Sequence, residues 1–302
     1  MTIAVTGGTG FVGHAFLDLA GDAQLRTRSL ARSPQGGRMG NVWVRGGLED
    51  RAALAELVGP AEAVVHIAGV TSSHDDTDFE TGNVIGTLNL VAAAKAAGVK
   101  RFIFVSSLAA REPELSLYGG SKARAEKIVQ ASGLDWTIVR PPAVYGPRDR
   151  DMFELFRMAR WGVVPAPKRG RASLIHVYDL ARLLMALAQN GHETIHRVIE
   201  PDDGVPGGWD HQELALAIGA AMGRRVVVLG QSARSLRWAA RLDRMMKGDK
   251  AKLTPDRASY LAHPDWVVSP EHRVPDHIWR PRIETRDGLK ATAKWYRDED
   301  WL

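Results

Sequence analysis

The stretch that decides the fold is Thr2-Ile-Ala-Val-Thr-Gly-Gly-Thr-Gly-Phe-Val-Gly13, at the start of the 302-residue chain. Its β-branched opening predicts a strand over Thr2–Thr6, and the glycines predict a turn into a helix. In this spacing Gly7 permits a tight turn, Gly10 lets backbone approach a pyrophosphate, and Gly13 packs helix against strand. The helix N-terminus then offers free N–H groups to phosphates, so the stretch predicts a dinucleotide-binding loop.

Short β-rich segments alternate with helical patterns through the first two hundred residues. Such alternation implies a parallel sheet with helices on both faces, the doubly wound α/β (Rossmann) fold. The predicted strands are Thr2–Thr6, Gln24–Ala31, Val42–Arg45, Ala63–Ile67, Arg101–Ser106, Asp135–Arg140 and Thr194–Ile199. The predicted helices are Gly10–Ala20, Arg51–Val58, Asp78–Ala97, Leu117–Ser132 and Val177–Gln189.

Beyond Pro201 the pattern changes. The turn-rich run Asp202-Asp-Gly-Val-Pro-Gly-Gly208 interrupts the chain, and helices then recur without clear strand partners. We therefore predict a Rossmann domain over residues 1–200 and a smaller, mostly helical substrate-binding lobe over 201–302. Residues 148–175 are expected to contribute partly to that lobe.

Composition excludes several kinds of site. The chain has no cysteine, so disulfides, thiolate catalysis and cysteine-ligated zinc are ruled out. No apolar run approaches the length needed to cross a bilayer, and no signal-type segment precedes the first strand, so we expect a cytoplasmic protein. No metal site is expected, because His192 and His196 straddle a predicted helix end and lack a third ligand.

The net charge of +5 comes from one segment. Residues 224–252 hold nine Lys or Arg and two Asp or Glu, which is +7 and leaves −2 for the rest. A charge excess confined to one segment does not indicate a basic surface that binds along nucleic acid. We therefore expect no nucleic-acid partner. Residues 232–247 predict a helix that carries Arg234, Arg237, Arg241 and Arg244 on one stripe, with Trp238 near its border. This helix could lie on the inner face of a membrane, cover a substrate or pack on the core.

A second pattern is Tyr118-Gly-Gly-Ser-Lys122, which begins eleven residues after Ser107. Residues four apart share a helix face, so Tyr118 and Lys122 can reach one ligand. A free phenol, with a pKa of about 10, is a poor base near neutrality, and a fixed ammonium favours its ionised form. A serine at the adjacent strand end can bond a substrate oxygen. Beside a dinucleotide loop, this predicts an acid/base group for proton transfer next to a hydride carrier.

The end of the second predicted strand bears on cofactor choice. NAD-selective sites usually place Asp or Glu there to hold the ribose hydroxyls. Here the run Thr27-Arg-Ser-Leu-Ala-Arg-Ser33 has no acid. Arg32, with Arg28 as a second candidate, could face a 2′-phosphate, unless both are solvated surface residues. We therefore expect NADP, with NAD as the alternative.

As a set, these motifs resemble the extended short-chain dehydrogenase/reductase family, which includes NAD-dependent epimerases and dehydratases. Phe102-Ile-Phe-Val-Ser-Ser107 resembles its serine strand, Tyr118 with Lys122 its active-site pair, and Asn83 its helix asparagine. Later signatures are matched by Arg140-Pro-Pro-Ala-Val-Tyr-Gly-Pro147 and Ile175-His-Val-Tyr-Asp-Leu180. The resemblance is dense to about residue 200 and sparse after it.

The resemblance implies four catalytic residues, Ser107, Tyr118, Lys122 and Asn83. In ketone reduction Ser107 would orient the carbonyl oxygen, Tyr118 would give the proton, and Lys122 would tune the tyrosine and hold the nicotinamide ribose. Together with Arg32, the expected cofactor contacts are Gly7, Gly10, Phe11, Val12, Gly13, Leu48, Ala68, Gly69, Lys122, Pro141 and Val144.

Two departures from the family pattern bear on the ligands. Gly46-Gly47-Leu48 stands where the family often has an Asp near adenine, so adenine is expected to be held mainly by backbone. Sugar-nucleotide epimerases and dehydratases tend to carry an Arg-Tyr-Phe-Asn-like run, but this chain has Ala143 in place of the Asn. That is closer to the 3β-hydroxysteroid dehydrogenase and ketone reductase branch. It implies a hydrophobic substrate, sterol-like or a 3-oxo lipid such as an oxidised ceramide.

Two other functions remain open. A sugar-nucleotide epimerase or dehydratase is opposed by Ala143, and a non-catalytic cofactor-binding assembly or regulatory protein is opposed by the intact Ser107, Tyr118 and Lys122. A homodimer and a membrane contact through 232–247 remain open as partners besides the small hydrophobic substrate.

Overall fold

The computed structural model describes residues 1–73, 75–190, 192–232, 234–235, 238, 260 and 263–302. The chain divides into two compact units whose segments alternate along the sequence. The first comprises Met1–Pro141, Tyr178–Pro201 and Glu271–Arg280, and the second Pro142–Val177, Asp202–Pro270 and Pro281–Leu302. That residues 1–200 bind the cofactor and residues 201–302 bind the substrate stays a prediction.

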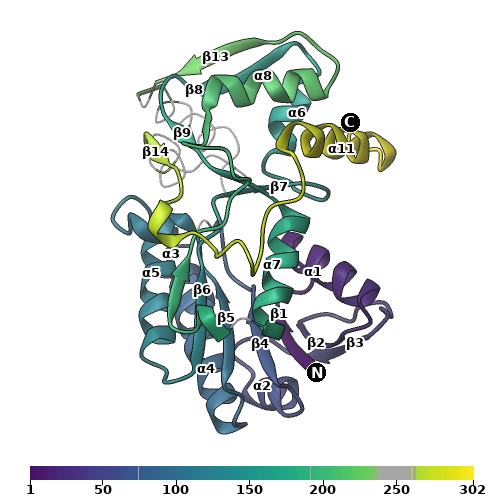
Figure 1. Ribbon diagram of the computed structural model, residues 1–302, viewed down its shortest axis with the longest axis vertical. Coiled ribbons are helices and arrows are strands. Elements are labelled where there is room, and N and C mark those ends of the chain that lie inside the picture. Colours follow the sequence, from purple (N-terminus) through teal and green to yellow (C-terminus); the bar gives the residue numbers. More distant parts are fainter. Residues whose placement is uncertain (74, 191, 233, 236–237, 239–259, 261–262) are drawn as a thin grey trace. The chain divides into compact units, whose positions relative to one another are not determined.

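The first unit is built on a seven-stranded parallel sheet with the order β11-β6-β5-β4-β1-β2-β3 (Figure 1). Its strands are β1 (Thr2–Thr6), β2 (Arg26–Ala31), β3 (Asn41–Arg45), β4 (Ala63–His66), β5 (Arg101–Val105), β6 (Asp135–Val139) and β11 (Arg197–Ile199). The doubly wound fold is therefore confirmed. Every predicted strand of this sheet is present, with ends that differ by a few residues at most, as strand ends often do.

Helices follow the strands and cover the sheet: α1 (Phe11–Asp22), α2 (Arg51–Val58), α4 (Gly86–Ala96), α5 (Leu117–Gln130) and α7 (Val177–Asn190). The single helix predicted over 78–97 is instead three segments. A short α3 (Asp76–Phe79) leads into a π-helical turn, η1 (Glu80–Ile85), and then into α4. Such turns carry an extra residue and occur frequently at functional sites. This one contains Asn83.

The core of the first unit lies between the sheet and its helices. All four residues of β4 are buried, as in a central parallel strand covered on both faces. Phe102 and Ile138 from the sheet pack with Leu54 and Leu57 of α2 and with Leu90 of α4, and none of these side chains is exposed. This packing fixes the strand ends at which the motifs lie.

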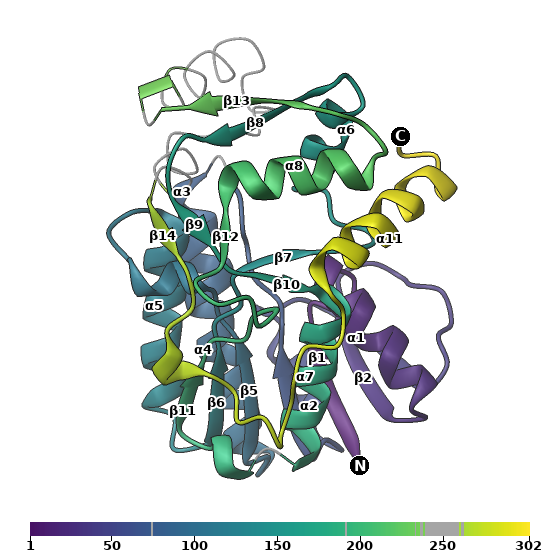
Figure 2. The ribbon, with the colours of Figure 1, turned by 45° about the horizontal axis from the view of Figure 1, so that its top comes forward.

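The described part of the second unit contains three α-helices and several short strands. Its helices are α6 (Phe153–Ala159), α8 (His211–Ala221) and α11 (Thr285–Asp298). Its strands pair as β7 (Ala143–Tyr145) with β10 (Leu174–His176), β8 (Val163–Pro167) with β13 (Val227–Gln231), and β9 (Arg171–Ala172) with β12 (Trp209–Asp210) and β14 (Asp265–Trp266). Figure 2 shows α8 alongside the β8–β13 pair, with which it is in contact.

None of these seven strands of the second unit was predicted. Three of them, β9, β12 and β14, span only two residues each, which is too short to show an alternating pattern. The predicted basic helix over 232–247 lies outside the described residues apart from Ser232, Arg234, Ser235 and Trp238. None of the helices in the described part of the chain is long and apolar enough to span a membrane.

Candidate active site

The glycine loop joins β1 to α1 and has no room for a side chain at Gly7 or Gly13. Gly7 has a φ of +75°, and a Cβ on it would lie 2.6 Å from the amide nitrogen of Ala68. A Cβ on Gly13 would lie 2.0 Å from the carbonyl oxygen of Gly7. Side chains at these positions would force the loop apart from α1 and from the segment after β4. The resulting cradle of bare backbone fits the close approach of a pyrophosphate.

The N-terminus of α1 is open. Gly10 is its N-cap, and glycine has no side chain that could cap the N–H groups of the first turn. Gly10 is exposed, and Phe11 and Val12 are half-buried. Unpaired N–H groups and the positive end of the helix dipole together attract phosphate. The predicted cofactor contacts Gly10, Phe11 and Val12 lie at this open end of the helix.

The strand order places this loop at the switch point of the sheet, where β1 lies between β4 and β2. Doubly wound proteins bind ligands at this point, beyond the carboxyl ends of the strands. The segment after β4 lies beside the loop, because Ala68 N–H donates to Thr6 Oγ1 at 3.3 Å. A Cβ on Gly69 would lie 3.0 Å from Asn83 Oδ1 and 3.5 Å from Lys122 Nζ. Ala68 and Gly69 thus connect the glycine loop to two predicted catalytic residues.

Arg32 and Leu48 follow the ends of β2 and β3. Arg32 is exposed and takes part in no ion pair within the described part of the chain. Arg28, the other candidate for a 2′-phosphate, instead pairs with Glu56 at 3.1 Å. The carbonyl of Leu48 accepts a hydrogen bond from Asn89 Nδ2 at 2.9 Å, which holds the loop after β3 against α4.

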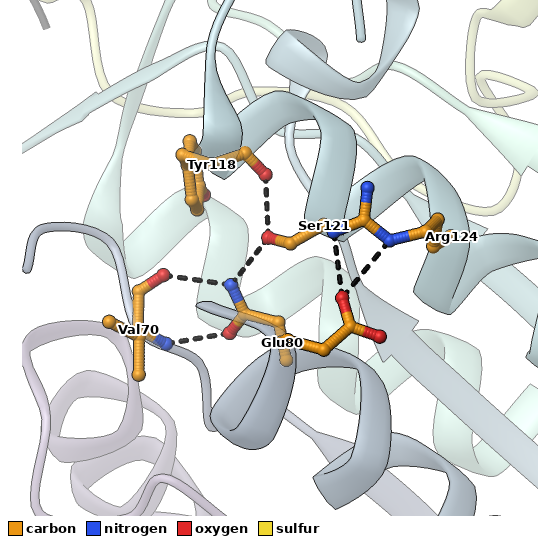
Figure 3. Close-up of polar contacts among 6 residues, drawn as sticks. Val70, Glu80, Tyr118, Ser121 and Arg124 are labelled. Carbon is orange, nitrogen blue, oxygen red and sulfur yellow. Dashed lines mark hydrogen bonds and ion pairs between the residues drawn. The ribbon is translucent and has the colours of Figure 1, made fainter. Parts of the chain in front are cut away.

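Asn83 ties the loop after β4 to α5. Its Oδ1 accepts from Val70 N–H at 2.7 Å, and its Nδ2 donates to the Val70 carbonyl and to Ser121 Oγ, each at 2.9 Å. Ser121 Oγ donates in turn to the carbonyl of Tyr118 at 2.8 Å, and Figure 3 shows this chain from Val70 to Tyr118. Both ends of the buried Asn83 amide are therefore bonded to protein, so Asn83 fixes the position of the first turn of α5.

Lys122 extends from α5 beneath the end of β5. Its Nζ donates to the carbonyl of Val105 at 2.8 Å and lies 4.4 Å from the centre of the Phe104 ring. Burial lowers the pKa of Lys122 to about 8, and the nearby carboxylate of Glu126 limits this decrease. Lys122 is therefore mostly an ammonium at neutral pH and loses its charge under mildly alkaline conditions.

Ser107 begins a 3₁₀ turn, η2 (Leu108–Arg111), directly after β5. Its Oγ accepts from Ala109 N–H at 3.2 Å, which uses a lone pair and leaves the hydroxyl proton to be donated. The helix α5 comes close to this turn at Gly119, where a Cβ would lie 2.6 Å from the Ala109 carbonyl oxygen. Tyr118 is half-buried beside Phe79, with the ring centres 6.5 Å apart.

His66 was not among the predicted site residues, yet it links two of the site's segments. The Thr87 hydroxyl donates to the Asn83 carbonyl at 2.6 Å, so it accepts from His66 Nε2–H at 2.9 Å. His66 Nδ1 then accepts from Thr6 Oγ1 at 2.6 Å. Burial, reinforced by the charge of Lys122, lowers the pKa of His66 to about 3, so the imidazole stays neutral.

A buried ionic cluster supports the other side of α5. Ser106 Oγ donates to Glu126 at 2.5 Å, and the Arg140 guanidinium holds the same carboxylate at 2.9 and 2.6 Å. Arg140 also lies 3.5 Å from Glu200. Glu126 follows Lys122 by four residues, a helical spacing that could have identified it from the sequence. His66 lies within an apolar run, and no sequence pattern marks it.

Two predicted cofactor contacts follow β6. The carbonyl of Pro141 accepts Leu108 N–H at 3.0 Å, beside Ser107. Val144 lies in β7 of the second unit, opposite Ile175, so it belongs to a different compact unit from the other predicted contacts. Among the described residues no group of three or more His, Asp or Glu side chains is arranged to hold a metal ion.

Comparison with known proteins identifies relatives of two kinds. Residues 3–199 match the model of the NAD dependent epimerase/dehydratase family. A ceramide reductase of Caulobacter vibrioides is 32% identical over 99% of this chain and 96% of that protein. A UDP-glucose 4-epimerase of Vibrio cholerae is 29% identical over 61% of this chain and 65% of that protein. In fold, the chain resembles Thermus thermophilus UDP-glucose 4-epimerase solved with NAD, with a TM-score of 0.72, 21% identity and coverage of 98% and 99%.

Proposed function

The chain belongs to the NAD dependent epimerase/dehydratase family, a family of enzymes, and on this premise we propose that it is an NADP-preferring ketone reductase or alcohol dehydrogenase for a hydrophobic substrate. The extent of the similarity to the ceramide reductase of Caulobacter vibrioides carries this proposal. It spans 99% of the chain, including the residues beyond 200 in which the recognisable cofactor motifs stop. A long-chain 3-oxo lipid such as an oxidised ceramide is the proposed substrate class, with a sterol-like ketone as the alternative.

The proposed chemistry uses the hydroxyls of Ser107 and Tyr118 on one substrate oxygen. A bound nicotinamide cofactor supplies the hydride that reaches the carbonyl carbon. Ser107 donates a hydrogen bond that orients the carbonyl, and Tyr118 gives its proton to the oxygen, so the ketone becomes a secondary alcohol. The ammonium of Lys122 stabilises the phenolate that Tyr118 then becomes. In the oxidation direction these transfers are reversed, and Tyr118 accepts the proton of the alcohol.

Asn83 and His66 serve this chemistry as positioning residues. Asn83 contacts Val70 and Ser121 rather than open space, so its role is to hold the first turn of α5, which carries Tyr118. His66 joins Thr6, at the start of the glycine loop, to Thr87 and through it to Asn83. We therefore propose that these buried hydrogen bonds fix the position of Tyr118 relative to the glycine loop.

The preference for NADP rests on Arg32. No acidic residue occupies the end of β2, and the exposed guanidinium of Arg32 has no ion-pair partner in the described part of the chain. A guanidinium binds phosphate through paired N–H groups, which suits a 2′-phosphate. The ribose of NAD has an uncharged 2′-hydroxyl in place of the phosphate, so it would form no comparable ionic contact with arginine.

A second candidate is a sugar-nucleotide epimerase, favoured by the similarity to the Vibrio cholerae enzyme. Ala143 opposes it, since a methyl group cannot make the hydrogen bonds that an asparagine amide makes to a sugar nucleotide. The two candidates differ in cofactor use. An epimerase restores its cofactor within each cycle, whereas a reductase consumes it.

The test is turnover of the two substrate classes by the same preparation. The purified protein is incubated with NADPH and an oxidised ceramide in detergent micelles, and separately with UDP-glucose. We expect NADPH oxidation in equal amount to the alcohol formed in the first reaction, and no UDP-galactose in the second. UDP-galactose formation without reduction of the lipid would favour the epimerase.

A homodimer and a cytoplasmic location are retained as proposals from the sequence. Ile85 and Leu88 on η1 and α4, and Leu117 on α5, are exposed apolar side chains that a dimer interface could bury. Sedimentation equilibrium of the purified protein would test the dimer.

A further inference from the structure

The β8–β13 pair of the second unit has an open apolar face. Val163 pairs with Val227, and Pro165 pairs with Leu229 in parallel register. Paired residues of neighbouring strands point to the same face of a sheet, and the intervening residues point to the other. The alternate face of β8 is buried against α6 and α8. Val227 and Leu229 are 64% and 47% exposed, and Val163 and Pro165 are half-buried, so the outer face is apolar and partly exposed.

Trp161 stands at one end of this face. It is 80% exposed, the most of any large apolar residue in the described part of the chain. The next residue, Gly162, accepts a hydrogen bond from Val227 N–H at 2.8 Å, so the indole precedes the first paired residues of the two strands. An indole so exposed is suited to a boundary between apolar and wet surroundings, because its ring is apolar and its N–H is polar.

The charged residues of the two segments that form the face all have one sign. Every charged residue in 160–171 and 224–235 is Lys or Arg. Arg160 precedes Trp161, and a Cβ on Gly162 would lie 3.8 Å from the carbonyl oxygen of Arg225. Arg160, Arg224 and Arg225 are exposed, and within the described residues none of them takes part in an ion pair. The apolar face therefore has a basic border, and none of its three arginines is paired with an acidic side chain of the described residues.

We propose that this surface, the Trp161 face, docks on an anionic lipid bilayer. It is formed by Trp161, Val163, Pro165, Val227 and Leu229 with the border residues Arg160, Arg224 and Arg225. Tryptophan prefers the membrane–water interface, and basic residues are attracted to anionic headgroups. A second copy of the chain is a poorer occupant, because two-fold contact of the face with itself would set arginines against arginines. The inference does not rest on the proposed reaction, since docking is measurable without turnover.

The experiment is co-sedimentation of the purified protein with vesicles of phosphatidylcholine and phosphatidylglycerol at low salt. We expect binding that falls as salt rises, and little binding to vesicles of phosphatidylcholine alone. Arg224→Ser with Arg225→Ser should weaken binding about 30-fold, which corresponds to about 1 kcal/mol for each arginine near the surface. Trp161→Ser should also weaken binding and should reduce the quenching of the protein's tryptophan fluorescence by brominated lipid.

The control is Arg26→Ser with Lys100→Ser, two exposed basic residues of the first unit. It removes the same charge and should leave vesicle binding unchanged. All variants keep residues 232–247, so the contribution of that segment is constant. The proposal is overturned if the parent protein ignores anionic vesicles at low salt, or if the control weakens binding as much as the test pair. Self-association that depends on Trp161, without vesicle binding, would assign the face to a second copy instead.

Discussion

The Nζ atom of Lys122 donates a hydrogen bond to the carbonyl oxygen of Val105, 2.8 Å away. Val105 is the last residue of β5, and Ser107 begins the turn that follows it. The bond therefore holds the helix that carries Tyr118 and Lys122 against the strand end that carries Ser107. It also holds the ammonium of Lys122 in a buried position, where burial lowers its pKa to about 8.

The first prediction concerns this charge. We expect kcat/KM for ketone reduction to fall as the pH rises above about 8, because the pKa of Lys122 is lowered to about 8 and the side chain is charged only below that value. Without the charge, the phenolate formed on Tyr118 is no longer stabilised. The measurement is the pH profile of kcat/KM for the parent and for Lys122→Arg. Arginine stays protonated, so the residual activity of the variant should lack the alkaline decrease; an identical decrease would assign it to another group.

A second prediction concerns cofactor choice. Arg32→Ala should raise the dissociation constant for NADPH roughly tenfold to a hundredfold and leave that for NADH unchanged, because about 1.5–3 kcal/mol of charge-assisted hydrogen bonding to the 2′-phosphate is lost. Fluorescence titration with both cofactors measures this. The matched control is Arg26→Ala, at the opposite end of β2 and also exposed. Equal weakening of both cofactors by Arg32→Ala would show that this arginine does not read the phosphate.

The contact between α5 and η2 gives a third prediction. Gly119→Ala places a methyl group 2.6 Å from the carbonyl oxygen of Ala109, so α5 must move away from the turn after Ser107. We expect a loss of about 1–3 kcal/mol in the free energy of unfolding and a lower kcat. Gly36→Ala is the control, since a Cβ there meets nothing within 4 Å. Urea unfolding and steady-state kinetics check both variants, and an unaltered kcat in Gly119→Ala would contradict the proposed geometry.

The fourth prediction concerns His66 and stability in acid. Its pKa is about 3 in the folded protein and 6.5 in a model peptide, so the unfolded chain binds more protons in between. The stability linked to His66 is therefore complete above pH 6.5 and decreases as the pH falls toward 3, by up to about 1.4 kcal/mol per pH unit. His66→Gln should be less stable than the parent at neutral pH, and the difference should shrink in mild acid. A difference that stays constant between neutral pH and pH 5 would contradict the neutral, buried imidazole.

The parts of the site that depend on short-range spacing could be predicted from the sequence. Gly7, Gly10 and Gly13 form one turn, and Tyr118 with Lys122 lies within one helix, so both patterns are visible in a few residues. The alternation of strands and helices then placed them on a doubly wound sheet. Their expected roles in catalysis remain predictions that the variants above would test.

The rest depends on contacts between distant parts of the chain. His66 acts through Thr6 and Thr87, which are 60 and 21 residues away, and its own neighbours form an ordinary buried strand. The π-helical turn at Asn83 interrupts a region whose sequence reads as one helix. The exposed face beside Trp161 arises from pairing of β8 with β13, two strands separated by more than fifty residues. No local pattern contains that information.

The proposed chemistry is tested most directly by following the hydride. The parent protein receives an oxidised ceramide and NADPH that carries deuterium at the transferable position of its nicotinamide ring. We expect one deuterium on the alcohol carbon of the product for each NADPH consumed. We expect no product from Tyr118→Phe, which should still bind NADPH with nearly unchanged affinity, because the phenol acts on the substrate and the glycine loop holds the cofactor. An alcohol without deuterium, or near-normal turnover in Tyr118→Phe, would contradict the proposal.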